Sequence, residues 1–215
     1  MVLSSYTKRS IKYDLLRLRA RISSAFRNAK FPDKDKLHFG CGSRRIDGWL
    51  NVDVQDSEWD VDLTAKLPWE DDVFTLIVGQ QVIEHLDLIR ELPGLLAELK
   101  RVLSHGGVLW LACPDMKKIC QAYMQDRGQK ILSGRMGRYP LAWYGRLPSQ
   151  QIINEFFNQG GEHKNLFDFE LLSFLVEQAG FSACFEESED SFLASVPGFP
   201  PRNDNDVSIY VKCIK

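Results

Sequence analysis

Two glycines and one acidic residue are spaced so that they could bind a ligand that carries a ribose. Gly40-Cys41-Gly42 directly follows a short apolar run at 36–39, and Asp53 lies at the end of a second apolar run at 50–54. In an open α/β sheet, ligands bind beyond the carboxyl ends of the strands. Glycine allows the backbone to turn sharply there and a ligand to approach closely, and the Asp53 carboxylate could accept hydrogen bonds from both ribose hydroxyls.

Two missing motifs narrow the nature of this ligand. The dinucleotide fingerprint G-x-G-x-x-G needs a glycine at position 45, where this chain has Arg45, and no phosphate-binding motif ending in GK[ST] is present. The expected ligand therefore has a ribose and needs no phosphate cradle. S-adenosylmethionine fits that description better than NAD or ATP.

The elements that must position these residues follow an α/β order. From residue 36 onward, short apolar runs alternate with helical patterns, which predicts a mainly parallel sheet. One predicted helix runs from Leu92 to Val102, and Asp168 is expected to cap a later helix that Gly180 ends. The expected strands lie at 36–39, 50–54, 75–78, 108–112, 181–186 and 207–213.

The alternation of strand and helix patterns is interrupted between residues 114 and 167. Such a long interruption in a compact domain is usually functional, so residues 117–166 are predicted to form a substrate-binding insert or lid. A helical segment that only covers the sheet edge is the alternative. Tyr123, Tyr139, Trp143 and Tyr144 could stack on a sugar or flat ring, or pack the insert against the body.

Five ordered motifs resemble those of the class I methyltransferases, specifically the small predicted type 11-like group. They are GCGSRRIDGWLNVD at 40–53, DLTAKLPW at 62–69, VIEHL at 82–86, LKRVLSHGG at 99–107 and FDFELLSFLVEQAGF at 167–181. The resemblance covers residues 36–215 apart from the insert. It implies a Rossmann-like, seven-stranded, mostly parallel sheet with an antiparallel last strand, helices on both faces, and S-adenosylmethionine as the cofactor.

The same resemblance implies a set of cofactor contacts. His38 stands where many relatives carry an acid that binds the methionine amino group, so that contact is altered here. The implied contacts are Gly40, Cys41 and Gly42 at the methionine and ribose, Asp53 at the ribose, Asp62 and Leu63 at the adenine, and Gln80 near the methionine.

Two histidines are candidates for a catalytic role. A sulfonium is already a good leaving group, so the protein's main task is to align the acceptor, and a hydroxyl acceptor also benefits from a general base, most often His. His85 and His163 could serve, or could each brace a loop. The segment from Gln81 to His85 resembles an E-x-x-E-H segment that holds Mg²⁺ with a distal His in some methyltransferases. Gln81 replaces the first Glu and removes a carboxylate that a hard cation prefers, so no metal ion is expected.

Composition argues against several other classes of protein. The 215 residues suffice for one domain with a full core, and a net charge of −2 argues against a protein built to bind nucleic acid. No apolar run approaches the ~20 residues that span a bilayer, and no secretory signal is apparent. Five scattered cysteines without a CxxC pair indicate reduced thiols. A cytoplasmic location is expected.

The N-terminal segment, residues 1–35, is predicted to be a basic helical extension of a domain at 36–215. Residues 1–36 hold ten Lys or Arg against three acids. An apolar stripe is usually core, which favours a helix that packs this stripe on the domain; the alternative is a basic amphipathic surface for peripheral membrane contact or a polyanionic substrate. The stripe consists of Ile11, Leu15, Leu18, Ile22 and Ala25.

The sequence therefore favours a methyltransferase that acts on an oxygen of a small molecule or of a glycan or polysaccharide precursor. Methylation of nucleic acid is the weaker enzyme hypothesis, because the chain lacks an Asn/Asp-Pro-Pro-aromatic motif and added RNA-binding modules. The alternative outside the enzymes is a non-catalytic docking subunit with a methyltransferase fold. The oligomeric state is left open.

Overall fold

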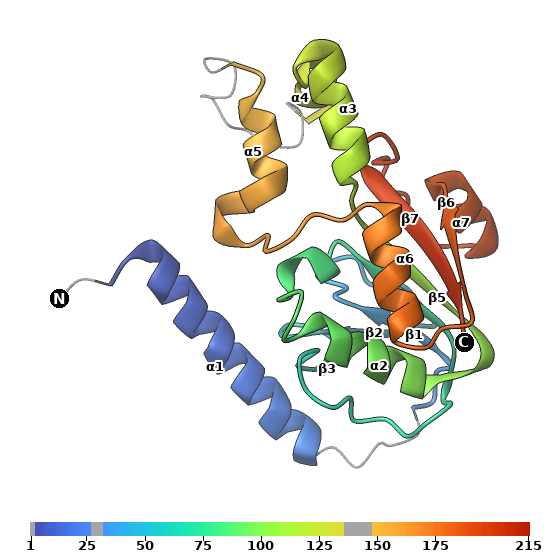
Figure 1. Ribbon diagram of the computed structural model, residues 1–215. Helices are drawn as coiled ribbons and strands as arrows, with labels where there is room; N and C mark the ends of the chain where they lie inside the picture. The colour runs from blue at the N-terminus through green and yellow to red at the C-terminus, as the bar shows by residue number, and fades with distance from the viewer. Residues whose placement is uncertain (1–2, 27–31, 136–147) are drawn as a thin grey trace.

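The computed structural model describes residues 3–26, 32–135 and 148–215, which form an α/β domain around one seven-stranded sheet (Figure 1). The strand order is β3-β2-β1-β4-β5-β7-β6, and β7 alone runs antiparallel to its neighbours. This confirms the predicted sheet. The strands are β1 (Lys36–Phe39), β2 (Leu50–Asp53), β3 (Trp59–Asp60), β4 (Phe74–Gln80), β5 (Leu103–Pro114), β6 (Ala183–Glu187) and β7 (Ser208–Ile214).

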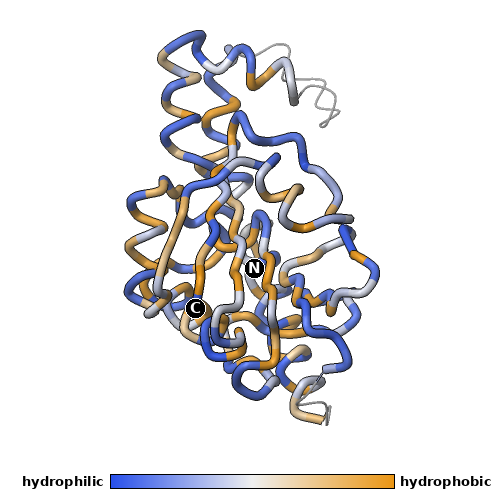
Figure 2. Tube along the Cα trace, turned by 90° about the vertical axis from the view of Figure 1, so that its right-hand side faces the viewer, coloured by the Kyte–Doolittle hydropathy of each residue, from blue (hydrophilic) through white to orange (hydrophobic). Residues whose placement is uncertain are grey.

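Helices cover both faces of the sheet, as expected. The helices α2 (Leu92–Val102) and α6 (Phe169–Gln178) bury leucine and valine side chains in a core on one face. The helix α7 (Glu189–Ser195) places Phe192 in a second cluster on the other face, against Trp110 and Tyr210. Figure 2 shows the hydrophobic stretches gathered in the central strands.

Side chains of β1 alternate between these two cores, because successive residues of a strand point to opposite faces. Leu37 and Phe39 lie in the first core, while His38 contacts Phe199 of the second with 5.0 Å between ring centroids. The strand therefore delivers its last residues to the turn at Gly40 in a fixed orientation.

The Asp168 cap forms as predicted and supports a stability test. Its Oδ1 accepts a hydrogen bond from the Leu171 backbone N–H at 2.9 Å, which satisfies one of the free donors at the start of α6. We expect Asp168→Ala to lower the free energy of unfolding by about 1 kcal/mol, measured by urea denaturation. Asp168→Ser retains a capping oxygen and should lose less; equal losses in both variants would contradict the capping role.

The described part of the insert, residues 117–135 and 148–166, is mostly helical. It contains α3 (Met116–Asp126), α4 (Gln129–Arg135), α5 (Gln151–Asn158) and a 3₁₀ turn, η3 (Gln159–Gly161). Ile119, Leu132, Ile152 and Phe156 form a small core of their own. The side chain of Tyr123 is exposed, whereas Tyr139, Trp143 and Tyr144 lie outside the described residues.

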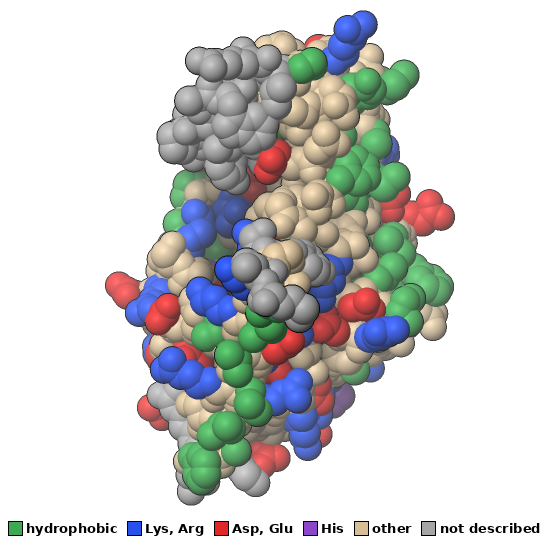
Figure 3. Space-filling model, turned by 90° about the vertical axis from the view of Figure 1, so that its left-hand side faces the viewer, with side chains coloured by type: hydrophobic (Ala, Val, Ile, Leu, Met, Phe, Trp, Pro, Cys, Tyr) green, Lys and Arg blue, Asp and Glu red, His purple; other side chains and the backbone are tan. Residues whose placement is uncertain are grey.

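The N-terminal helix α1 (Ser5–Phe26) packs on the domain, but with the opposite face to the one predicted. Four residues of the apolar stripe, Ile11, Leu15, Leu18 and Ile22, are 44–61% exposed. Figure 3 shows hydrophobic side chains along this outer face, with Lys and Arg beside them. The domain instead contacts polar residues of α1, namely Arg9, Arg17 and Arg21.

Two short elements were not predicted. The strand β3 has only two residues, and α7 lies in a stretch expected to be loop, where the Ser188 side chain accepts from the Ser191 N–H and so starts the helix. Among the described residues, no helix is both long and apolar enough to cross a membrane.

Candidate functional site

A cavity of about 390 Å³ opens at the carboxyl ends of the parallel strands, between the sheet, α1 and the end of the insert. Its volume lies in the range of small-molecule sites. Of the residues predicted from the sequence, Gly40, Asp53, Asp62, Leu63 and His85 line it. The cavity therefore forms at the place where the strand order predicted a ligand.

The turn after β1 and the carboxylate of Asp53 form one hydrogen-bonded unit. Gly40 and Gly42 have φ angles of 62° and 50°, in the left-handed region that favours glycine. The Gly42 N–H donates to Asp53 Oδ2 at 2.9 Å, and the Val54 N–H donates to Asp53 Oδ1 at 2.6 Å. A carboxylate has about four acceptor positions, so about two remain for a ligand in the cavity.

Asp62 lines the cavity, but α1 already engages it. Its Oδ2 accepts from Arg21 Nε of α1 at 2.5 Å, and its Oδ1 accepts from the backbone and hydroxyl of Thr64 at 2.9 and 2.7 Å. The side chain of Asp62 is almost fully buried, whereas that of Arg21 is half exposed. The neighbouring Leu63 offers an apolar wall at the same place.

The predicted contacts at His38, Cys41, Gly42 and Gln80 are not part of the cavity lining. His38 is buried in the opposite core, with its Nδ1 3.4 Å from Asn51 Oδ1. Because strand side chains alternate, His38 cannot face the cavity while its neighbours in β1 fill the first core. His38, at the position where many relatives carry an acid, therefore lies on the side of the sheet away from this cavity. Gln80 is buried as well, and its Oε1 has no hydrogen-bond partner among the described residues.

The buried position of His38 predicts a pH-dependent stability. Burial lowers the pKa of His38 from 6.5 to about 4, so the unfolded chain takes up the proton first as pH falls below about 6.5. Stability is then lost between about pH 6.5 and pH 4. We expect His38 to account for about 2 kcal/mol of the loss between pH 7.5 and pH 5. Urea denaturation of wild type and His38→Gln at both pH values measures it, and an identical pH dependence in both proteins would contradict the assignment.

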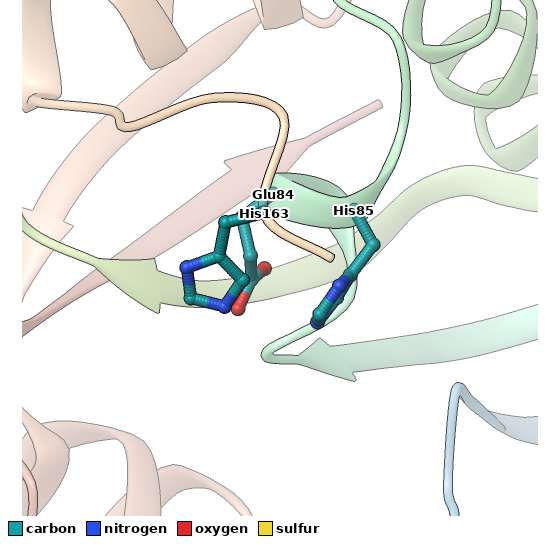
Figure 4. A group of neighbouring side chains, drawn as sticks. All are labelled: Glu84, His85 and His163. Atoms are coloured by element: carbon teal, nitrogen blue, oxygen red, sulfur yellow. The ribbon is translucent and has the colours of Figure 1, made fainter. Parts of the chain in front are cut away.

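The two predicted histidines lie together with a buried glutamate (Figure 4). The rings of His85 and His163 are 4.9 Å apart between centroids, in an edge-to-face arrangement. Glu84 precedes His85 on the 3₁₀ turn η1 (Ile83–His85) and is fully buried. Burial raises the pKa of Glu84 to about 8 and lowers that of His85.

Backbone carbonyls fix the orientation of both imidazoles. His85 Nδ1 lies 3.2 Å from the Glu162 carbonyl oxygen, and His163 Nδ1 lies 2.6 Å from that of Phe156. A carbonyl oxygen only accepts, so each Nδ1 carries the proton and each Nε2 keeps a lone pair. The Glu84 carbonyl accepts from the Lys164 N–H at 2.8 Å, which ties the loop of His163 to η1.

The contribution of α1 and of the insert's last residues to the cavity was not predicted from the sequence. Arg9, Tyr13 and Arg17 of α1 line it, together with Glu162 and Lys164. Arg9 pairs with Glu162 at 3.0 Å, and Arg17 pairs with Glu91 at 2.9 Å. The available signal was the polar face of the N-terminal helix, which carries Tyr13 and Arg17 opposite the apolar stripe.

Glu91 joins three elements at the edge of this cavity. Its Oε2 accepts from Lys164 Nζ at 2.8 Å, and its Oε1 accepts from Arg17. Partial burial alone would raise the pKa of Glu91, but the hydrogen bond from Lys164, that from the Asp87 N–H and the charge of Arg17 lower it to about 2. Glu91 is therefore ionised at neutral pH and holds α1 beside the insert.

Comparisons with known proteins agree with this fold. Residues 51–111 match the model of a family described as a methyltransferase domain, and no curated protein sequence matches the chain. A methyltransferase structure from Archaeoglobus fulgidus shares 14% identity over 99% of this chain and 100% of its own, with a TM-score of 0.48. One from Mesorhizobium loti shares 13% identity over 91% and 96%, with a TM-score of 0.46.

A third structure is a phosphoethanolamine N-methyltransferase of Haemonchus contortus in complex with S-adenosyl-L-methionine. It shares 11% identity over 92% of this chain and 52% of its own, with a TM-score of 0.45. The strand order, the antiparallel β7 and the matching segment give this chain the Rossmann-like fold of the class I methyltransferases.

Proposed function

We propose that this chain is an S-adenosylmethionine-dependent methyltransferase that methylates an oxygen of a small molecule or a glycan precursor. One observation carries the proposal: the Asp53 carboxylate, at the end of β2, faces a cavity beside the glycine turn of β1. The family match over residues 51–111 supports the same cofactor.

The residues present fit this cofactor. Asp53 retains acceptor positions for a pair of ribose hydroxyls, and Val54, Val61 and Leu63 provide apolar surface for a flat base. Gly40 lines the cavity directly after β1. Bound S-adenosylmethionine supplies a methyl group on a sulfonium, whose sulfur keeps the electron pair of the broken bond.

The remaining task of the protein is to position an acceptor and move one proton. His85 lines the same cavity, and its Nε2 keeps a lone pair because Nδ1 donates to the Glu162 carbonyl. It can therefore accept the proton that a hydroxyl acceptor loses as its oxygen bonds to the methyl carbon. His163 packs against His85 and fixes the orientation of that ring.

The experiment is calorimetric titration of the purified protein with S-adenosylmethionine and with S-adenosylhomocysteine, followed by transfer of a labelled methyl group to a panel of hydroxylated acceptors. We expect one binding site per chain for both compounds and no binding of NAD. A folded protein that binds neither compound would contradict the enzyme proposal and favour a docking subunit. Binding without transfer to any hydroxyl, but with transfer to an amine, would contradict only the oxygen acceptor.

A further inference from the structure

Glu84, His85 and His163 form a cluster whose chemistry the proposed methyl transfer leaves unexplained. A buried carboxylate normally accepts hydrogen bonds, because burial without them costs several kcal/mol. Glu84 is fully buried, yet neither of its carboxylate oxygens has a hydrogen-bond partner among the described residues. One atom from each of the three side chains lies within 4.8 Å of the others.

The surroundings of the two imidazoles match those of metal ligands. A ligating His usually donates its second ring N–H to a carbonyl or carboxylate, which fixes the tautomer and the ring orientation. Both His85 and His163 donate Nδ1–H to a backbone carbonyl, at 3.2 and 2.6 Å. Figure 4 shows the Glu84 carboxylate between the two rings.

The loop that carries His163 is held firmly against η1. The backbone N–H groups of Lys164 and Asn165 both donate to the Glu84 carbonyl, at 2.8 and 3.3 Å, and Asn165 Nδ2 donates to the Leu86 carbonyl at 2.5 Å. These bonds join residues that are about 80 positions apart in the chain. The cluster is therefore built on a braced junction and not on a free loop.

We propose that Glu84, His85 and His163 bind one first-row divalent transition-metal ion, with Zn²⁺ as the reference ion. Two neutral imidazoles and one carboxylate suit such an ion, whereas Mg²⁺ and Ca²⁺ prefer oxygen ligands throughout. Three protein ligands leave a coordination position open. Ligands of tetrahedral Zn²⁺ lie roughly 3.4 Å apart and these three atoms lie within 4.8 Å of one another, so binding needs each pair to approach by at most about 1.4 Å.

The open position bears on the proposed function. His85 is the member of the cluster that lines the cavity, so an ion held there can take an acceptor oxygen as a further ligand. This use of the ion rests on the proposed methyl transfer. A bound ion would occupy the lone pair of His85 Nε2 that serves as the base in the metal-free protein, and it would supply the same proton removal by lowering the pKa of a hydroxyl bound to it.

No metal ion was expected from the sequence, because Gln81 replaces the first acid of the E-x-x-E-H pattern. The structure shows Gln81 donating from Nε2 to Ser208 Oγ at 3.1 Å. The E-x-x-E-H pattern with a distal His provides two carboxylates and suits Mg²⁺. Glu84, His85 and His163 provide two nitrogens and one carboxylate, which suit a transition-metal ion instead.

The test measures metal binding in the absence of S-adenosylmethionine. A negative result therefore contradicts the metal site alone and leaves the proposed methyl transfer untouched. Chelator-treated protein is titrated with Zn²⁺ against a chromophoric competitor, and with Co²⁺ to record the visible absorption of a low-coordinate site. Cys120→Ser serves as the background, because Cys120 is the exposed thiol among the five cysteines. We expect one ion per chain and a higher Tm in the presence of Zn²⁺.

Matched variants decide the assignment. Glu84→Gln and His163→Gln should each weaken Zn²⁺ binding roughly 100-fold or more, since even supporting residues around a metal cost 10–100-fold. His105→Gln, which alters an exposed histidine outside the cluster, should bind as the background does. Circular dichroism verifies folding, and Glu84→Gln retains the shape of the side chain. No binding by the background protein, or equal affinity in Glu84→Gln and His105→Gln, would overturn the proposal.

A second observation concerns the outer face of α1. Ile11, Leu15, Leu18 and Ile22 form a continuous exposed stripe, and Phe26 extends it with 86% of its surface exposed. The stripe spans about 22 Å at 1.5 Å per residue. The inner face of the helix makes the ion pairs with the domain, and within the described part of the chain the stripe stays exposed.

The charges on this face indicate what covers it. Lys8, Lys12 and Arg19 are exposed along one edge of the stripe, and Asp14 is the only acidic residue of α1. Two copies of α1 packed stripe to stripe would bring these cations together, which disfavours self-association. We infer that this face lies on an anionic lipid surface, with the stripe in the interface and the cations at the headgroups.

Vesicle flotation tests this second inference. We expect binding to vesicles of phosphatidylcholine with phosphatidylserine that weakens as salt rises, and at least tenfold weaker binding to phosphatidylcholine alone. Leu15→Gln combined with Leu18→Gln should reduce binding at least tenfold, and so should Lys12→Glu combined with Arg19→Glu. Ile89→Gln is the control, because Ile89 is 80% exposed elsewhere. Two results would overturn the membrane inference. One is a wild-type protein that forms a dimer which the Leu15→Gln, Leu18→Gln variant no longer forms; the other is a wild-type protein that binds neither kind of vesicle.

Discussion

An Asp53→Ala variant is expected to bind S-adenosylmethionine about 100- to 1000-fold more weakly than the wild-type protein. Hydrogen bonds to a charged group contribute about 1.5–3 kcal/mol each, and two ribose hydroxyls are expected to donate to this carboxylate. A loss of about 3–4 kcal/mol corresponds to that change in Kd. Calorimetric titration at constant ionic strength measures it.

Two further variants separate a loss of cofactor affinity from a loss of folded structure. Asp53→Asn keeps an acceptor oxygen and should lose about tenfold in affinity, since it lacks the charge. Asp60→Asn alters a nearby acid of β3 that accepts from Ser57 and does not line the cavity, so its affinity should be unchanged. Asp53 also holds the Gly42 N–H, and urea denaturation shows how much stability is lost with it. A Kd for Asp53→Ala within twofold of wild type would rule out the ribose assignment.

A Gly40→Ala variant is expected to lose about 2–5 kcal/mol of unfolding free energy. A Cβ at Gly40 would lie 2.1 Å from Cγ2 of Val82, a collision that costs about 1–3 kcal/mol in a packed site. The φ angle of 62° adds about 1–2 kcal/mol for any residue with a Cβ. Urea denaturation measures the total.

Gly42 offers the matched control for this change. It has a similar φ angle of 50°, but a Cβ there would meet no atom within 4 Å. Gly42→Ala should therefore lose only the backbone part, about 1–2 kcal/mol. Adding Val82→Ala to Gly40→Ala should recover part of the loss, because it removes the colliding methyl groups. Equal losses at Gly40 and Gly42 would show that the contact with Val82 has no effect.

The sequence predicted those parts of the fold that depend on local patterns. Strand positions followed from short apolar runs, and the Asp168 cap followed from one residue before an apolar helix. The turn at Gly40 and the acid at Asp53 were predictable because a parallel sheet brings the carboxyl ends of β1 and β2 to one edge. The face of the sheet on which the His38 side chain lies was not predicted. A four-residue strand that is buried on both faces shows no alternation of polar and apolar residues.

The parts that were missed depend on contacts between distant segments. The apolar stripe of α1 predicted packing on the domain, yet Arg17 and Arg21 find carboxylates at Glu91 and Asp62 that lie 74 and 41 residues away. Periodicity shows that a helix has two unlike faces; it does not show which of them meets the domain. The meeting of His85 with Glu84 and His163 likewise depends on the hydrogen bonds that draw the end of the insert onto η1.

The attachment of α1 has a kinetic consequence. The helix forms one wall of the cavity, and three ion pairs join it to the described part of the body: Arg9–Glu162, Arg17–Glu91 and Arg21–Asp62. In each pair at least one partner is partly exposed to solvent, so dissolved salt weakens the attraction between the two charges. Such a wall can part from the sheet while the sheet stays intact. We therefore expect the rate at which the spent cofactor leaves to depend on ionic strength, and on whether a surface holds the outer face of α1.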